Sequence, residues 1–484
     1  MSKVLEWLSN RPGYLLGGAA VVYLLLGWGQ DGINLDSATY ATIARNMADF
    51  GGWFTPHYTA FYYPAFAEHP PLVMWLQGLV FLAFGSSDST ARIIGALCTL
   101  GSILVVYRIG RHILGRHYGF LAGLTLLLTY NFIQIGNSTL LDVPMTFFVL
   151  VAMLGIIKMQ KFGVTASNAL LTGAALGLAW LAKGVVSGPA WAALVLTCLL
   201  FNRRWLRKKE FWLAPAAAIA IMGIHLLLDQ AFAGGHFTQH YFLKQVFKRF
   251  LGGGPHSDSR WWEFSYRFAK LYLPFIILFP FGIYFAIKKR VNALYPIMIT
   301  VVFFAIFLSV AAKLYYHYFC PVYALAAPIS ALPVALLLTE KQVKKLAFGF
   351  FILWILAAIG VKVADVRVHE LRTAEIYSLN EPMAKLLDTL PSRNGLSPGT
   401  PPPTWDQIAK AAWYWRSDLR QIGNIDEAVK LLKTATYGYL LVERSEKQAE
   451  SEIENRFSDV FEKRLGNDRI SIYILKTNRP AGNE

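Results

Sequence analysis

The chain has 484 residues, of which 55% are hydrophobic and only 16% are charged, and its mean hydropathy is +0.40. This composition excludes an ordinary soluble globular protein. The net charge of +16 would suit a nucleic-acid partner, but the basic residues gather in short links between apolar runs, as in the cytoplasmic loops of membrane proteins. The sequence therefore predicts an α-helical polytopic membrane protein that does not bind nucleic acid.

Apolar stretches recur from Tyr14 to Lys362, and a hydrocarbon core of about 30 Å requires about 20 residues per helix. The first stretch, Tyr14–Gly29, lacks a small-residue cleavage site after it, so a retained signal-anchor helix is expected rather than a cleaved signal peptide. The three cysteines lie within apolar segments without metal-ligand spacing, which favours core packing. The further predicted spans are Pro71–Gly85, Ala91–Tyr107, Tyr118–Ile135, Val143–Lys158, Ala169–Ala182, Pro189–Phe201, Phe211–Phe232, Leu271–Ile287, Ala293–Ala312, Leu314–Leu338 and Leu346–Val361.

Basic links set the expected orientation. Asn202–Glu210, Lys288–Arg290 and Lys341–Lys345 are predicted to be cytoplasmic, which places the loops 31–69 and 236–270 outside. With the first helix, these are twelve predicted spans. An N-terminus inside and a C-terminal part outside require an odd number of spans, so the count conflicts with the orientation. A hairpin of two short helices within Gly119–Gly136 would repair the count, giving 12–13 transmembrane helices, but it would place the basic segment Arg108–His117 outside, against the charge rule.

The composition changes after the last predicted span. Five prolines lie within Leu390–Thr404, and alternating helix and strand patterns follow. Asn424 with Glu427 predicts a capped helix start, Tyr437–Val442 and Ile470–Leu475 predict strands, and a helix is expected around Ala449–Val460. We therefore expect a membrane domain at 1–362 and a small extracytoplasmic α/β domain at 363–484.

Five polar residues at predicted membrane boundaries are candidates for chemistry. Asp36, at the start of an amphipathic helix, is either a helix cap or a general base, and the sequence favours neither. Asp142 is either a cap or part of a polar site, and Lys183 either snorkels to the headgroups or holds a phosphate. Glu68 and His69 precede a pair of prolines, and both are either simply interfacial or functional. If they are functional, Glu68 binds a metal or orients a substrate, and His69 contacts a phosphate.

The predicted outer loop 236–270 is rich in cations and aromatics. An interfacial amphipathic helix with an aromatic belt would explain this composition, and so would a basic, aromatic pocket for an anionic lipid head.

Together these residues resemble a known pattern. An acid followed by YATIARNM, then GGWFTPH and EHPPL, precedes LLDVP, LAKG, HSDSRWWEF and KLYYHYFCPVYAL in that order. This ordered set resembles the bacterial protein-mannosyltransferase-like glycosyltransferases, including the aminoarabinose transferases that modify lipid A. The resemblance implies a GT-C fold and a sugar transferase that uses a polyprenyl-phosphate donor at the outer face of the cytoplasmic membrane. The acceptor would be a lipid, a glycan or a protein.

The resemblance also implies roles for individual residues. Asp36 and Asp142 match the catalytic acids, and Lys183 and Arg249 match phosphate-binding positions. His69 stands where the family motif has a phosphate-contacting lysine. Glu68 matches an acid that looks like a metal ligand for zinc or magnesium, and either of two histidines would complete that site, His240 or His256.

Two other function classes compete with a transferase. A transporter or flippase of lipid-linked sugars would have inverted repeats and broken midplane helices, and neither pattern is visible in the sequence. It would also carry charges at mid-membrane, whereas the best candidate residues lie at predicted outer boundaries. A non-catalytic relative would bind a partner through its outer domain. The joint presence of Asp36, Glu68 and Lys183 favours the enzyme.

Overall fold

The protein is described here by a computed structural model. The structure describes residues 12–26, 28, 32–247, 262–309, 314–339, 379–398, 405–443, 447–467 and 469–476, together with single residues and short runs between 341 and 360. Arg249 and His256 lie outside the described residues, as does most of the predicted span Leu346–Val361.

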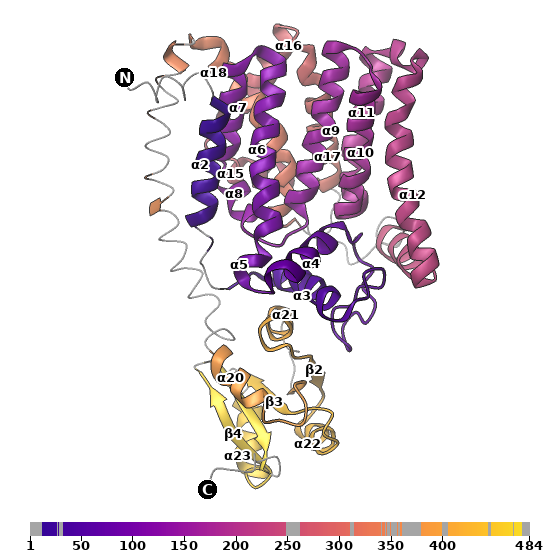
Figure 1. The fold of residues 1–484 in the computed structure, drawn as a ribbon. Helices are drawn as coiled ribbons and strands as arrows, with labels where there is room; N and C mark the ends of the chain where they lie inside the picture. The colour runs from indigo at the N-terminus through magenta and orange to yellow at the C-terminus, as the bar shows by residue number, and fades with distance from the viewer. Residues whose placement is uncertain are drawn as a thin grey trace.

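A bundle of apolar helices forms the larger part of the molecule (Figure 1). Six helical stretches among the described residues are long and apolar enough to cross a membrane, and the bent pair α7–α8 passes the same test as one span. Three shorter apolar helices accompany them. The bundle helices are α2 (Pro12–Leu26), α6 (Ile93–Leu114), α7 (Arg116–Leu127), α8 (Tyr130–Gly136), α9 (Asp142–Phe162), α10 (Ala166–Lys183), α11 (Gly188–Leu196), α12 (Leu213–Ala233), α15 (Glu263–Leu271), α16 (Leu278–Lys288), α17 (Tyr295–Ser309) and α18 (Cys320–Leu337).

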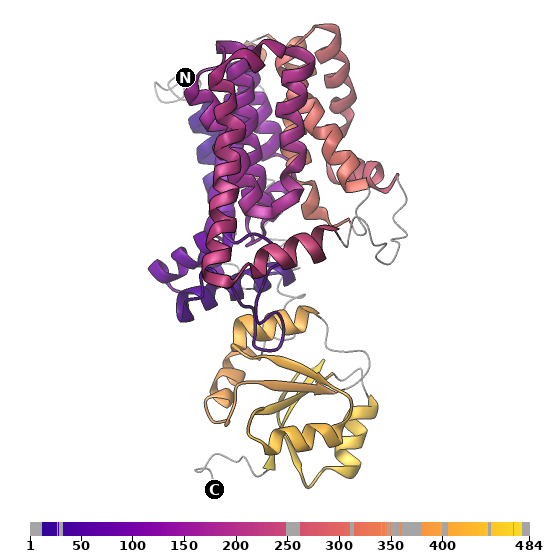
Figure 2. The same ribbon diagram turned by 90° about the vertical axis from the view of Figure 1, so that its right-hand side faces the viewer.

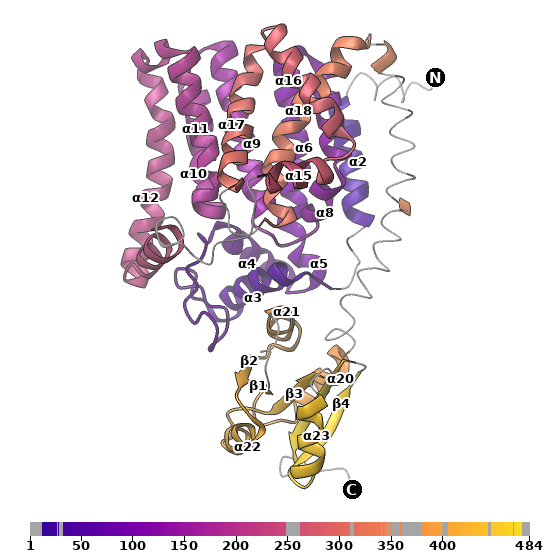
Figure 3. The same cartoon turned by 180° about the vertical axis from the view of Figure 1, so that it is seen from behind.

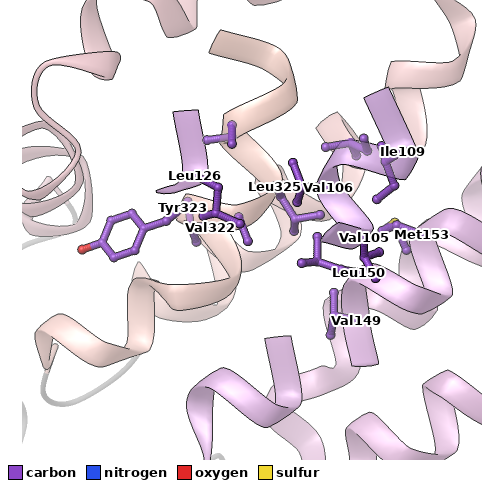
Figure 4. Packing of buried hydrophobic residues seen from close by; sticks show 14 of the residues in the cluster. Val105, Val106, Ile109, Leu126, Val149, Leu150, Met153, Val322, Tyr323 and Leu325 are labelled. Carbon is purple, nitrogen blue, oxygen red and sulfur yellow. The ribbon is translucent and has the colours of Figure 1, made fainter. Parts of the chain in front are cut away.

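The core of the bundle is built from aliphatic side chains on α6, α7, α9 and α18 (Figure 4). Val106, Leu150 and Leu325 are completely buried where these helices meet. Small residues bring neighbouring helices close, as is common in membrane bundles. A Cβ at Gly173 of α10 would lie 2.1 Å from the Ala214 carbonyl oxygen of α12, so only glycine permits this approach.

Helix directions follow from such contacts. Gly173 meets Ala214 and Gly177 meets Ala218, so α10 and α12 run in the same direction. The helix α11 between them must therefore run the opposite way, and α10 and α11 stand side by side in Figures 1 and 3. Gly184, with a φ of +68°, ends α10 and allows the reversal through η1 (Gly184–Ser187).

One end of the bundle is covered by a layer of short elements, which we call the α3 layer. It consists of α3 (Leu35–Phe50), α4 (Leu72–Phe84), α5 (Asp88–Ala91) and the loop 51–71. The apolar segment predicted to span the membrane at Pro71–Gly85 is α4, and it lies beside α3 in this layer (Figure 1). With 13 residues, α4 is too short for a span, and its Gly78 packs against Trp53 and Ala44 of the layer.

The opposite end of the bundle is basic. Lys161 at the end of α9 donates to the carbonyl of His112 at the end of α6, and the rings of Phe201 and Tyr295 meet beside two further basic links. The segment Arg108–His117 joins α6 to α7 at the end of the bundle away from the α3 layer. The proposed hairpin is instead the pair α7 and α8, bent by 70°.

A five-stranded sheet domain lies beyond the α3 layer (Figure 2). The strand order is β2-β1-β3-β5-β4, with parallel pairing among β2, β1 and β3 and antiparallel pairing of β5 with both β3 and β4. The predicted cap is confirmed, since the Asn424 side chain accepts from the Glu427 amide and Glu427 accepts from Gly423. The elements are α20 (Asn380–Leu387), β1 (Gly395–Pro398), α21 (Trp405–Lys410), η9 (Ala411–Trp415), β2 (Leu419–Ile422), α22 (Ile425–Lys433), β3 (Tyr439–Glu443), α23 (Lys447–Arg456), β4 (Phe461–Gly466) and β5 (Ile470–Leu475).

Candidate active site

A buried ion pair joins the ends of two bundle helices beneath the α3 layer. Asp142 is the first residue of α9 and Lys183 is the last residue of α10. The Lys183 Nζ lies 2.5 Å from Asp142 Oδ1, and the two residues are only 5% and 2% exposed. The ammonium also lies 4.7 Å from the centre of the Tyr318 ring. Because an acid at a helix start and a base at a helix end both complement the helix dipoles, the two helix ends favour this pair.

Neither acid serves as the helix cap that the sequence allowed. The cap of α3 is Asn34, whose side chain accepts from the Ser37 amide at 3.0 Å, while Asp36 is the second residue of the helix. The residue preceding α9 is Leu141, without a capping side chain. Both carboxylates are therefore available for other interactions.

Asp36 faces this ion pair from the first turn of α3. Its Oδ2 lies 3.9 Å from Nε2 of His317 in η8 (Tyr316–Phe319), and His317 is itself buried. The start of α3 is held against the loop before α9, because the Ser37 hydroxyl accepts from the Thr139 amide at 3.1 Å. Asp36, His317 and the Lys183–Asp142 pair thus form one polar cluster, which we call the Asp36 cluster.

The surroundings raise the pKa of Asp36. Loss of water around the carboxyl is the main cause, and the charge of Asp142 adds to it, whereas His317 and Lys183 act in the opposite direction. The Asp36 side chain nevertheless keeps 41% of its surface exposed. A carboxylate that is both poorly solvated and accessible suits proton transfer to or from a bound molecule.

Glu68 and His69 border the cluster from the loop 51–71. Tyr63 donates its hydroxyl to Glu68 Oε1 at 3.0 Å. The His69 ring lies 6.0 Å from the ring of Tyr40, which is one turn beyond Asp36 on α3. The phosphate-contact position of the resemblance therefore lies near the predicted catalytic helix.

The described residues do not fit a metal site. Among them, no three His, Cys, Asp or Glu side chains come close enough to hold an ion. Glu68 bonds to Tyr63, and the ring of His240 lies 5.7 Å from that of His236 in a different segment. Among the described residues, Glu68 and His240 therefore belong to no group of three metal ligands, and His256 lies outside the described part of the chain.

The sheet domain contacts α3 through η9. Arg45 donates to the carbonyl oxygens of Trp413 and Ala412 at 2.7 and 2.9 Å, and its guanidinium lies 5.3 Å from the Trp413 ring. The Tyr414 hydroxyl accepts from the Ile33 amide just before α3. Asp88 binds Trp413, Tyr414 and the amide of Gly32. We call the segment Ala412–Tyr414 the clasp, since it holds both the lead-in and the middle of the helix that carries Asp36.

Sequence reasoning missed His317, the clasp and His225. His317 lies in the motif KLYYHYFCPVYAL of the resemblance, but no role was predicted for it. The clasp joins residues more than 300 positions apart, which no local pattern reveals. His225 had a usable signal, because an ionisable residue inside an apolar span is rare and usually functional.

Comparison with known proteins gives consistent matches. Residues 68–227 match the family model of dolichyl-phosphate-mannose-protein mannosyltransferases. Undecaprenyl phosphate-alpha-4-amino-4-deoxy-L-arabinose arabinosyl transferase 2 of Proteus mirabilis is 24% identical over 260 residues, 53% of this chain and 46% of that protein. The chain thus matches about half the length of this relative.

Solved structures share the whole fold. ArnT from Cupriavidus metallidurans in the apo state has a TM-score of 0.76 at 16% identity, with 100% of both chains covered. The same protein bound to undecaprenyl phosphate has a TM-score of 0.75 at 17% identity, covering 97% of this chain and 99% of that one. These findings agree with the predicted resemblance: the chain shares its fold with ArnT, and parts of its sequence are similar to the mannosyltransferase family model and to the aminoarabinose transferases.

Proposed function

We propose that the protein transfers a sugar from a polyprenyl phosphate to an acceptor at the outer face of the cytoplasmic membrane. The Asp36 cluster carries this proposal. In this cluster the Asp36 carboxylate is accessible and its pKa is raised. It lies 3.9 Å from His317 and close to the buried ammonium of Lys183. The sequence relatives named as undecaprenyl phosphate-dependent arabinosyl transferases support the donor class.

The reaction that suits this geometry is a single inverting displacement. The acceptor hydroxyl oxygen attacks the anomeric carbon, the bond from that carbon to the phosphate oxygen breaks, and polyprenyl phosphate leaves with the electron pair. Asp36 takes the proton of the hydroxyl as the new bond forms. An acceptor that attacks through an already ionised phosphate has no proton to give, and Asp36 would then orient it.

Positive charge near the leaving phosphate lowers the barrier. In this proposal Lys183 supplies it, because its ammonium lies next to Asp142 within the Asp36 cluster. Asp142 acts through Lys183 as a positioning residue. His69 and Arg249 are further phosphate contacts in the proposal, and Arg249 lies in the part of the chain that the structure does not describe.

The distribution of basic residues supports an outer position of the site. Arg108, Arg116 and Lys161 lie at the end of the bundle away from the α3 layer, together with the link Arg203–Lys209. Such residues mark the cytoplasmic side. The Asp36 cluster and the sheet domain lie at the other end, so the proposal assigns them to the outer side.

The rival transporter is less compatible with the structure. A transport pathway would carry its charges near the middle of the bundle. Asp142 and Lys183 instead lie at the ends of α9 and α10, and Asp36 lies in the α3 layer. The polar groups thus form a site at one surface.

The test is transfer by the purified protein. Undecaprenyl phosphates carrying different radiolabelled sugars are each mixed with lipid A, other envelope glycolipids, glycans and unfolded envelope protein. We expect one combination to give a labelled product and to release undecaprenyl phosphate in equal amount. The proposal fails if no donor is consumed although the protein binds it. Comparing the masses of envelope lipids and glycans with and without the protein identifies the physiological pair.

A further inference from the structure

A cavity of about 270 Å³ lies between the loop 51–71 and the end of α12. The loop contributes Phe54, Phe66 and His69 to its wall. The helix α12 contributes His225 and Asp229, and the short helix α13 (His236–Gln239) closes it. The cavity is near the lower end of the range of about 300–1,000 Å³ typical of small-molecule sites.

His225 is the unusual residue of this cavity. It is only 5% exposed, and neither ring nitrogen has a hydrogen-bond partner within the described residues. Its ring is surrounded by the rings of Phe237, Trp75 and Trp180 at 4.9, 5.9 and 6.0 Å. Leaving a buried polar group unpaired destabilises the fold by about 1–3 kcal/mol, so a histidine that only filled this space would be a poor choice.

The other buried polar group of the cavity is already used by the fold. Asp229 Oδ1 accepts from the Phe237 amide at 3.0 Å, and Oδ2 accepts from the amide and hydroxyl of Thr238 at 2.9 and 2.6 Å. Asp229 therefore shapes the turn into α13. His225 has no comparable structural task.

The chemistry of the wall narrows the class of ligand. The described residues form no metal-binding group here, and Asp229 adds a carboxylate to the wall. Aromatic faces next to an unpaired imidazole, which both donates and accepts, suit a neutral molecule with apolar C–H faces and hydroxyl groups. A sugar ring has both features.

We propose that this cavity binds one neutral sugar ring, with the ring nitrogens of His225 bonded to its hydroxyl groups. This inference rests on the proposed function, because it assigns a subsite to a transferred or receiving sugar. Two contacts connect the cavity to the helices that carry the cluster. His69 lines it and faces Tyr40 of α3, while Trp180, packed on His225, lies one turn before Lys183.

The experiment follows the histidine signals of the full-length protein in detergent. With ten histidines in the chain, ¹³C labelling at the imidazole carbon gives a countable spectrum, and His225→Phe identifies the resonance of His225. The probes are undecaprenyl phosphate alone, undecaprenyl phosphate linked to glucose, mannose or arabinose, and the free methyl glycosides of these sugars. A sugar-linked donor that shifts the His225 resonance assigns the cavity to the donor sugar. A shift with a methyl glycoside but with no donor assigns it to the acceptor sugar.

Two variants and a control complete the test. His225→Phe keeps the aromatic packing but removes the nitrogens, and Ala233→Leu narrows the cavity while leaving His225 in place. Each should weaken sugar binding about tenfold, as expected for one or two lost hydrogen bonds or a blocked wall, and leave the affinity for undecaprenyl phosphate unchanged. Leu227→Phe is the matched control, because Leu227 lies on the same helix and is 70% exposed.

Two outcomes would overturn the inference. If undecaprenyl phosphate alone shifts the His225 resonance as strongly as any sugar-linked donor, the cavity holds the lipid chain. If no sugar shifts it, the cavity is not a sugar subsite. Binding is measured without turnover, so the proposed function is judged separately by transfer. If the protein transfers sugar but no sugar shifts the His225 resonance, only this inference is wrong. If a sugar shifts the resonance but no transfer occurs, only the proposed function is wrong.

Discussion

Asp36 is the residue on which the proposed chemistry depends, and its protonation can be measured through activity. A general base works only when ionised, so transfer is lost as the pH falls through the pKa of Asp36. Because that pKa is raised above the ordinary value of 3.8, the acid limb of the kcat profile should lie above that of an ordinary aspartate. His317 lowers this pKa, so His317→Phe should move the limb to still higher pH. Identical limbs in the two proteins would contradict the role of His317.

The Lys183–Asp142 pair makes a prediction about stability. Lys183→Ala leaves the buried Asp142 carboxylate without its cation, and breaking a buried pair in this way costs about 3–5 kcal/mol. The double variant with Lys183→Met and Asp142→Leu removes both charges and should recover most of the melting temperature in detergent. Transfer should stay lost in both proteins, because neither supplies the cation. Full activity of the stable double variant would show that the pair is structural only.

At the scale of elements, the clasp connects the sheet domain to the helix that carries Asp36. Arg45→Met keeps the length of the side chain but leaves the carbonyls of Trp413 and Ala412 without their donor. We expect kcat to fall by about ten- to a hundredfold because Asp36 is less well positioned, with KM for the donor nearly unchanged. Arg45→Lys should recover part of the rate. A purely structural clasp would instead lower the amount of folded protein without lowering the kcat of what remains.

The elements also show which parts of the fold the sequence could reveal. Periodicity and apolar length identified α6, α9, α12 and α18, because each is a long run of residues that burial alone requires to be apolar. The same criterion failed for α4, since a short apolar helix that packs beside α3 has the composition of a span. The sequence could not show that Asn34, rather than Asp36, caps α3, or that Lys183 is the partner of Asp142. Both facts depend on three-dimensional contacts. The family resemblance pointed to Asp36 and Asp142 as catalytic acids, and the structure shows which residues surround them.

At the scale of the whole molecule, the two ends of the bundle differ in charge and hence in the side of the membrane they face. Glu381 lies exposed in the sheet domain, and Arg204 lies exposed in a basic link at the other end. A membrane-impermeant maleimide should label Glu381→Cys in intact cells, and should label Arg204→Cys only after the membrane is opened. The native protein, whose Cys198 and Cys320 are buried, gives the background. Labelling of Arg204→Cys in intact cells would reverse the orientation.

The central claim is that Asp36 takes part in sugar transfer while the rest of the site binds the donor. The most direct test compares single-turnover transfer and donor affinity for the native protein and Asp36→Asn. Glu381→Gln is the control, an exposed acid far from the site. With a hydroxyl acceptor, Asp36→Asn should slow transfer by about 10²–10⁴-fold, the usual contribution of a general base, with donor affinity and melting temperature kept. Undiminished transfer by Asp36→Asn would contradict the account.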